Sequence, residues 1–110
     1  MSAGKAAFFV AVDAGTIVAT SGALIRDGYP AAITQLRDGY IFGVRVAPGY
    51  RGRGIAERLT REAIAYLERA NCRSIRLHAS RFGRSIYERI GFVPTNEMEL
   101  PARGTSLPRV

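Results

Sequence analysis

The sequence predicts a mixed α/β fold, an α+β arrangement in which helices pack against a mixed sheet, and three observations support this class. Short apolar segments rich in β-branched and aromatic residues alternate with turn residues in the first part of the chain. One long segment with helical periodicity lies between the third and fourth of these apolar segments. The chain of 110 residues, 47% of them hydrophobic, is long enough to close one core without disulfides or metals.

The first part of the chain predicts three strands. Residues 7–12 and 16–25 flank the turn residues 13–15, which indicates a β-hairpin. Residues 26–39 contain two Asp-Gly pairs and a proline, so we expect a long excursion between strands there. Residues 40–46 are then predicted to form a third strand.

The second part predicts two helices and two further extended segments. We expect a helix over residues 54–70, a strand over 74–80, a short helix over 85–90 and a final extended segment over 92–100. Apolar residues recur at helical spacing in the first of these, namely Ile55, Leu59, Ala63, Leu67 and Ala70. The long helix is therefore a crossover between strands 40–46 and 74–80, which predicts that these strands are parallel and that the crossover is right-handed.

Composition limits the classes of function. The net charge of +7 comes from residues 45–89, which contain eleven arginines and four glutamates. Such a charge attracts nucleic acid or a multiply phosphorylated small molecule. No apolar stretch is long enough to span a membrane and no secretory leader is present, so we expect a cytoplasmic protein without a membrane partner. With one cysteine, Cys72, and one histidine, neither a disulfide framework nor a metal site is expected.

The turn after the third strand is an expected anion site. A glycine-rich turn that leads into a helix leaves several backbone N–H groups without partners, and the helix dipole reinforces them. Gly52 and Gly54 let a phosphate approach the backbone closely, while Arg51 and Arg53 can add charge-assisted hydrogen bonds. The turn lacks the Gly-Lys-Ser/Thr of the nucleotide phosphate loop and the third glycine of the dinucleotide fingerprint, which excludes both motifs.

Two segments carry a resemblance to a known family. Residues 46–56 have the pattern V-x-P-x-Y-R-G-x-G-I-A, and residues 85–94, SIYERIGFVP, carry a tyrosine on a short helix before Gly-Phe. Together they resemble the GNAT superfamily of acetyl-CoA-dependent N-acetyltransferases, and the ending PTNEMEL is similar to a bacterial subgroup. The resemblance covers about residues 7–100. It implies a GNAT-like acyl-CoA N-acyltransferase fold as one domain over residues 1–100, followed by a tail, 101–110, of disordered composition.

The resemblance also implies site residues, with acetyl-CoA as co-substrate and no metal. Backbone N–H groups of the turn would hold the pyrophosphate, with Glu57 at the margin; the turn comprises Arg51, Gly52, Arg53, Gly54, Ile55 and Ala56. The pantetheine arm would pair with the backbone of Val44, Arg45 and Val46. The Tyr87 hydroxyl would protonate the departing thiolate, and Ser80 takes the place of an asparagine that contacts the arm in many relatives.

The base that deprotonates the attacking amine is not assigned by the sequence. Many relatives have a glutamate on one of the two parallel strands, but residues 40–46 contain no carboxylate and residues 74–80 contain only His78 as a titratable candidate. A surface or partly buried strand histidine is a common structural residue, so His78 is one candidate among several. The others are Asp38, Glu97, Glu99 and ordered water.

Relative to the family pattern, the chain begins at the second strand, without the strand and two helices that wall the acceptor pocket. Three explanations fit this departure: the sequence begins late, a partner subunit completes the pocket, or the chain binds acetyl-CoA without efficient turnover. An open sheet edge near residues 7–12 favours a homodimer.

The sequence therefore predicts an N-acetyltransferase that transfers acetyl from acetyl-CoA to a primary amine of a small molecule or peptide. The alternative is a non-catalytic acetyl-CoA-binding or sensing module that lacks a complete acceptor site. Nucleic-acid binding is disfavoured, because the arginines surround a phosphate turn and are not interleaved with stacking aromatic residues.

Overall fold

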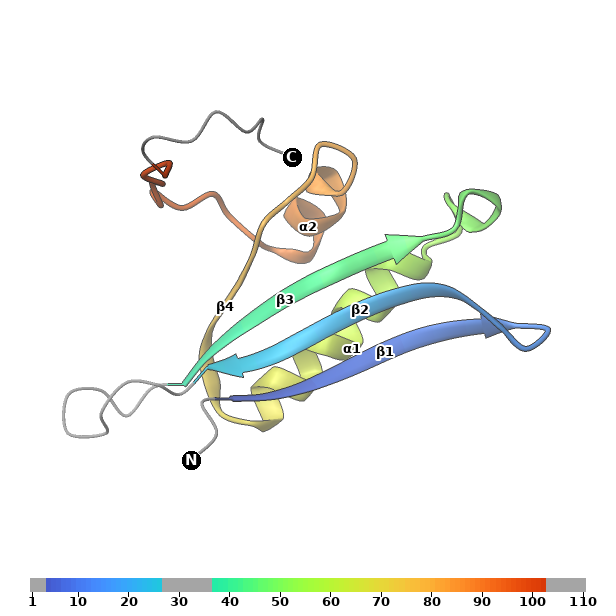
Figure 1. Ribbon diagram of the computed structural model, residues 1–110, viewed down its shortest axis with the longest axis horizontal. Coiled ribbons are helices and arrows are strands. Elements are labelled where there is room, and N and C mark those ends of the chain that lie inside the picture. Colours follow the sequence, from blue (N-terminus) through green and yellow to red (C-terminus); the bar gives the residue numbers. More distant parts are fainter. Residues whose placement is uncertain (1–3, 27–36, 103–110) are drawn as a thin grey trace.

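The computed structural model describes residues 4–26 and 37–102, and these contain one mixed sheet (Figure 1). The strands are β1 (Gly4–Asp13), β2 (Thr16–Arg26), β3 (Arg37–Val46) and β4 (Cys72–Leu77), and they lie in the order β1-β2-β3-β4. β1 pairs antiparallel with β2 and β2 with β3, whereas β3 and β4 are parallel. The predicted fold class and the predicted parallel pairing are both confirmed.

Helices follow β3 and β4. A short 3₁₀ helix, η1 (Pro48–Tyr50), leads into the turn before α1 (Ile55–Arg69), and α2 (Arg84–Ile90) follows β4. α1 ends at Arg69 and is capped by Ala70, and Asn71 adopts the left-handed conformation with φ 66°, as expected for a helix terminator. Figure 1 shows α1 against one face of the sheet, with α2 beside the end of β4.

The core lies between α1 and the sheet. Ile41 of β3 and Leu67 of α1 are almost completely buried, and each contributes about 1.5–3 kcal/mol through burial. They belong to a cluster of buried residues, Ala23, Ile25, Ile41, Ala63, Leu67 and Cys72. Because side chains alternate along a strand, Tyr40 and Phe42, the neighbours of Ile41, point to the opposite face of the sheet.

The structure corrects several predicted boundaries. β2 extends to Arg26 and β3 begins at Arg37, so the excursion between them is shorter than the predicted 26–39. β4 ends at Leu77 and not at residue 80, because its pairing with β3 stops there. Residues 27–36 and 103–110 lie outside the described residues, so the rest of the excursion and most of the predicted tail lie there too.

The final extended segment, residues 92–100, does not become a strand of the sheet. It has no regular secondary structure, and within the described chain the sheet has four strands. Pro94 has no backbone N–H to donate, and Val93, Met98 and Leu100 remain exposed. This segment instead runs along a cavity beside β3 and β4, described below.

Candidate active site

The two parallel strands separate beyond the middle of β3. Their pairing ends at Ile41 opposite Leu77, and in the part of the chain that the structure describes the rest of β3 has no strand beside it on this side. A bulge in the pairing of β2 and β3 accompanies the separation: Gly43 has φ 63°, and the Thr20 hydroxyl donates to its carbonyl at 2.7 Å. Figure 1 shows β3 and β4 diverging. The backbone edge of β3 is therefore open to an extended ligand.

A cavity of about 260 Å³ occupies this split. Its lining contains four of the residues predicted to touch acetyl-CoA, Val44, Arg45, Ser80 and Tyr87. Val46 does not line this cavity. The Ser80 hydroxyl accepts a hydrogen bond from the Gly83 N–H at 3.1 Å, so this side chain also holds the turn that precedes α2.

The glycine turn forms an anion-binding geometry at the start of α1. Gly52 and Gly54 have φ 78° and 79°, a left-handed conformation that only glycine adopts without strain, and a Cβ at either would point into open space. The first hydrogen bond of α1 runs from the Arg58 N–H to the Gly54 carbonyl at 3.1 Å. The N–H groups of Ile55, Ala56 and the following residue thus have no acceptor within the helix.

The side chains of Arg51 and Arg53, the two arginines of the turn, are engaged in contacts within the protein. Arg51 donates from Nε to the Val46 carbonyl at 3.2 Å. The Arg53 guanidinium lies 5.1 Å from the centre of the Tyr50 ring, and the Tyr50 hydroxyl donates to Asp13. These contacts fix the turn against β3 and the β1–β2 hairpin; the role of the two side chains toward phosphate stays a prediction.

Glu57 connects the first turn of α1 to α2. Its carboxylate pairs with Arg61 at 3.0 Å and with Arg89 at 2.8 Å. Arg89 and then Arg61, by hydrogen bonding to the carboxylate, hold the pKa of Glu57 below its ordinary value. Sequence reasoning missed Arg89, since a pair separated by 32 positions leaves no local signal.

Tyr87 is held in a nearly closed environment. Its side chain is 7% exposed, and its ring packs edge-on against Phe92 with the ring centres 6.1 Å apart. A Cβ at Gly83 would approach the ring to 2.9 Å, so a glycine is needed beside it. Burial raises the pKa of the Tyr87 hydroxyl above its ordinary 10.0, which keeps the hydroxyl protonated at neutral pH. This is the protonation state that a proton donor requires.

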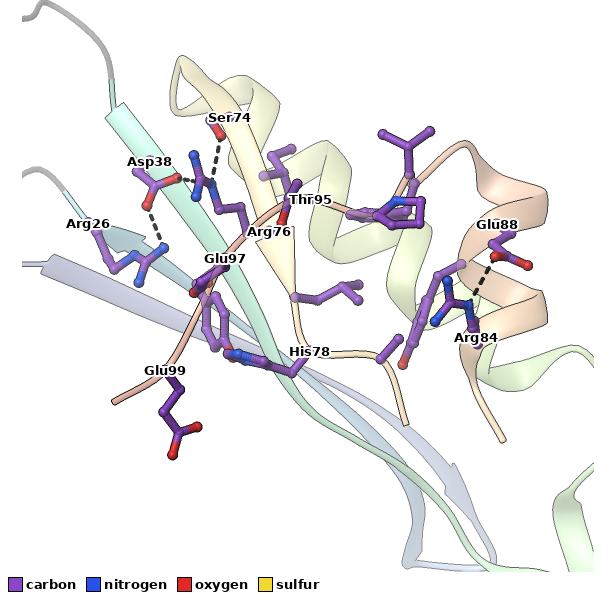
Figure 2. A pocket seen from close by; sticks show the side chains of 18 of the residues that line it. Arg26, Asp38, Ser74, Arg76, His78, Arg84, Glu88, Thr95, Glu97 and Glu99 are labelled. Atoms are coloured by element: carbon purple, nitrogen blue, oxygen red, sulfur yellow. Dashed lines mark hydrogen bonds and ion pairs between the residues drawn. The ribbon is translucent and has the colours of Figure 1, made fainter. Parts of the chain in front are cut away.

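A larger cavity, of about 1350 Å³, lies along β3, β4 and the C-terminal segment (Figure 2). At one end, Asp38 forms an ion pair with Arg26 and lies 4.0 Å from Arg76. Figure 2 shows Glu97 and Glu99 on the segment that crosses the cavity. All four of the residues predicted as base candidates, Asp38, His78, Glu97 and Glu99, thus line this cavity, although Asp38 is engaged by two arginines.

His78 and Tyr40 meet at the side of the larger cavity. His78 follows the last residue of β4, and its Nδ1 is hydrogen bonded to the Tyr40 hydroxyl. Tyr40 was missed by sequence reasoning, which treated it only as a strand residue. His78 lines both the cavity in the split and the larger one.

In residues 4–26 and 37–102, no group of three or more histidine, cysteine, aspartate or glutamate side chains is arranged to hold a metal ion. No helix in the same residues has the length and apolar character needed to cross a membrane.

The chain is similar to proteins of known structure. A predicted acetyltransferase from Clostridium acetobutylicum, crystallised with acetyl-CoA, is 31% identical with a TM-score of 0.79, and the match covers 87% of this chain and 64% of that one. A GCN5-related N-acetyltransferase from Ralstonia eutropha JMP134 is 32% identical with a TM-score of 0.76, covering 86% of this chain and 63% of that one. The chain thus spans 64% and 63% of the length of these two proteins.

A more distant structure shares the fold alone. Glucosamine-6-phosphate N-acetyltransferase from Arabidopsis thaliana is 18% identical with a TM-score of 0.76, over 89% of this chain and 67% of that one. A search among curated proteins gave no match. Residues 2–92 match the family described as the acetyltransferase (GNAT) family. The chain therefore belongs to the GNAT family of acetyltransferases.

Proposed function

We propose that this protein is an N-acetyltransferase, which transfers the acetyl group of acetyl-CoA to a primary amine of a small molecule or peptide. One observation carries the proposal: the open edge of β3 and the buried Tyr87 line one cavity, and the glycine turn at the start of α1 follows the same strand. Each is suited to a different part of the co-substrate. Family membership and a relative crystallised with acetyl-CoA support the same assignment.

The residues of the turn and of β3 fit acetyl-CoA. The N–H groups of Ile55 and Ala56, together with the open space beside Gly52 and Gly54, suit a pyrophosphate. The free edge of β3 at Val44 suits the amide groups of the pantetheine arm, which would pair with it as a further strand. Arg51 already donates to the Val46 carbonyl, so pairing at that residue requires the guanidinium to move.

The reaction needs one proton donor and one proton acceptor. As the amine attacks the thioester carbonyl, the C–N bond forms and the C–S bond breaks, with the electron pair leaving on sulfur. The Tyr87 hydroxyl, which its burial keeps protonated, would donate a proton to that thiolate. The amine would enter from the larger cavity, whose charged walls suit a polar acceptor. We also expect a cytoplasmic location, as the sequence predicts, and no nucleic-acid partner.

A homodimer is part of this proposal. Among the described strands, β1 pairs on one side only, and Phe8, Val10 and Val12 remain exposed on its face away from α1. An antiparallel pairing of two copies centred on Phe9 would set Lys5 opposite Asp13 of the partner subunit and Phe8 opposite Val10 of the partner subunit. Opposite charges at both ends and apolar pairs between them favour this register.

The direct test is calorimetric titration with acetyl-CoA, followed by measurement of thiol release from the same sample with a panel of amines. We expect saturable binding and release of free CoA thiol that depends on the amine. Binding without thiol release would support the alternative, a non-catalytic acetyl-CoA-binding module. If the folded protein binds no acetyl-CoA, both the transferase function and the binding-module alternative are wrong. A salt titration with duplex DNA would show whether the positive charge binds nucleic acid.

A further inference from the structure

The two cavities share only a narrow boundary. Three residues line both of them, Leu77, His78 and Tyr87. If acetyl-CoA lies along β3 and the acceptor lies in the larger cavity, the reacting atoms meet at this boundary. Two of the three shared residues can exchange protons, and Tyr87 is already suited to be the donor. His78 is therefore the residue of this boundary that is left to accept a proton.

We propose that His78 accepts the proton of the attacking amine and that Tyr40 is the positioning residue that orients its imidazole. The inference rests on the proposed function and names the base that the sequence left open. His78 Nδ1 is hydrogen bonded to the Tyr40 hydroxyl, and the two rings are 5.6 Å apart at 68°. In the tautomer whose Nδ1–H donates to the Tyr40 oxygen, Nε2 has a free lone pair for the proton of the amine.

Tyr40 itself is held in place. The Arg26 guanidinium lies 4.9 Å from the centre of its ring, and Arg26 is in turn paired with Asp38. Tyr40 also lies opposite Arg76 in the parallel pairing of β3 with β4, two residues before His78. The imidazole is thus oriented through a chain of contacts that begins on β2 and passes through β3.

The competing carboxylates line the larger cavity but not the cavity in the split. Asp38 is engaged by Arg26 and faces Arg76, while Glu88 is paired with Arg84 at 3.1 Å. Neither these carboxylates nor those of the C-terminal segment line the split between the strands. The charged and titratable groups that line the two cavities together with His78 are Arg26, Arg37, Asp38, Tyr40, Arg45, Arg76, Arg84, Tyr87, Glu88, Glu97 and Glu99.

The proton steps balance. With Nδ1–H donating to the Tyr40 oxygen, the Nε2 lone pair takes one proton from the amine nitrogen as the C–N bond forms. The C–S bond breaks, and the sulfur takes one proton from the Tyr87 hydroxyl. The imidazolium then loses its proton and the Tyr87 phenolate gains one, through solvent, so the enzyme returns to its starting state. The sum is amine plus acetyl thioester giving amide plus thiol.

The test compares His78→Gln and Tyr40→Phe with Tyr66→Phe, which removes a hydroxyl on α1 away from both cavities. We expect His78→Gln to lower kcat about 100-fold, with the Kd for acetyl-CoA within about twofold of wild type. The acidic limb of the kcat/KM profile should differ from that of wild type, since the titration of the amine itself is common to both proteins. Tyr40→Phe should shift that limb and lower kcat by less than about tenfold, and Tyr66→Phe should change neither.

A second measurement tests whether free imidazole can replace the missing His78 side chain. Imidazole in the buffer should restore part of the rate to His78→Ala, which a purely structural histidine would not allow. If wild type turns over while His78→Gln keeps its rate and its pH profile, the assignment of His78 is wrong and the proposed function stands. If wild type binds acetyl-CoA but releases no thiol with any amine, the proposed transferase function fails, and this step fails with it.

Discussion

Glu57, in the first turn of α1, accepts two hydrogen bonds from Arg89 of α2, from Nε at 3.1 Å and from Nη2 at 2.8 Å. The pair joins the two regions that the proposed reaction needs: the glycine turn lies just before Glu57, and Tyr87 lies two residues before Arg89. A carboxylate in the first turn also interacts favourably with the helix dipole. The pair thus ties the first turn of α1 to the helix that carries Tyr87.

Glu57→Gln should destabilise the protein at neutral pH, and the effect should depend on pH. Arg89 and Arg61 hold the pKa of Glu57 below its ordinary 4.5, so the carboxylate contributes stability above that pH. This contribution is lost as the pH falls through the lowered pKa of the folded state. Urea unfolding at pH 7 should show a lower free energy of unfolding for the variant, and the difference should shrink by about pH 3.

Glu88→Gln is the matched control for this comparison. Glu88 pairs with Arg84 within α2 alone and is half exposed, so its loss should matter less at every pH. A Glu57→Gln variant whose deficit is the same at both pH values would show that the carboxylate charge is not what holds α1 to α2.

Gly54→Ala should weaken acetyl-CoA binding far more than it weakens the fold. Gly54 has φ 79°, so alanine costs about 1–2 kcal/mol in backbone strain, and its methyl group would project into the space assigned to the pyrophosphate. We expect at least a tenfold higher Kd for acetyl-CoA in calorimetry. Gly15→Ala is the control: Gly15 has φ 81° in the β1–β2 turn, so alanine causes the same strain there, but outside the space assigned to the pyrophosphate. Equal affinities in the two variants would contradict the assignment of the turn.

Tyr87→Phe should lower kcat about 100-fold and leave the Kd for acetyl-CoA within about twofold, because the ring still fills its buried site. Since burial raises the pKa of Tyr87 above 10.0, the hydroxyl of the wild type should remain a donor throughout the neutral range. We therefore expect no alkaline loss of activity from this group below about pH 10. Steady-state kinetics across pH, with Tyr66→Phe as the hydroxyl control, would show this. An unchanged kcat would remove Tyr87 from the chemistry.

The parts of the fold and site that could be predicted are those with local signals. The glycine turn and the helix after it follow from residue spacing alone, whereas Tyr87 was singled out by the resemblance to the family. The contact between Tyr40 and His78 spans 38 positions and depends on the pairing of two strands, so no local pattern reveals it. Residues 92–100, predicted to be extended, do not join the sheet: a strand needs a partner, and sequence periodicity does not show whether an edge is available.

The proposed dimer can be tested by exchanging charges on β1. In the register centred on Phe9, Lys5→Glu would set a glutamate opposite Asp13 of the partner subunit at both ends of the paired strands. Each exposed pair contributes about 0.2–1 kcal/mol, so losing and reversing two of them should raise the dimer Kd about tenfold. Sedimentation should be run near 0.15 M salt, since the net charge of +7 opposes association at low salt.

The double variant Lys5→Glu/Asp13→Lys then restores opposite charges in the same register and should recover the dimer. Asp13 also accepts a hydrogen bond from the Tyr50 hydroxyl, so Tyr50→Phe is the control for losing that contact. Recovery in the double variant would establish both the partner and the register, because no other alignment of β1 with itself sets residue 5 opposite residue 13. Failure to recover, with the single variant still weakened, would mean that β1 associates in a different register. A wild type that sediments only as a monomer at micromolar concentration would remove the dimer altogether.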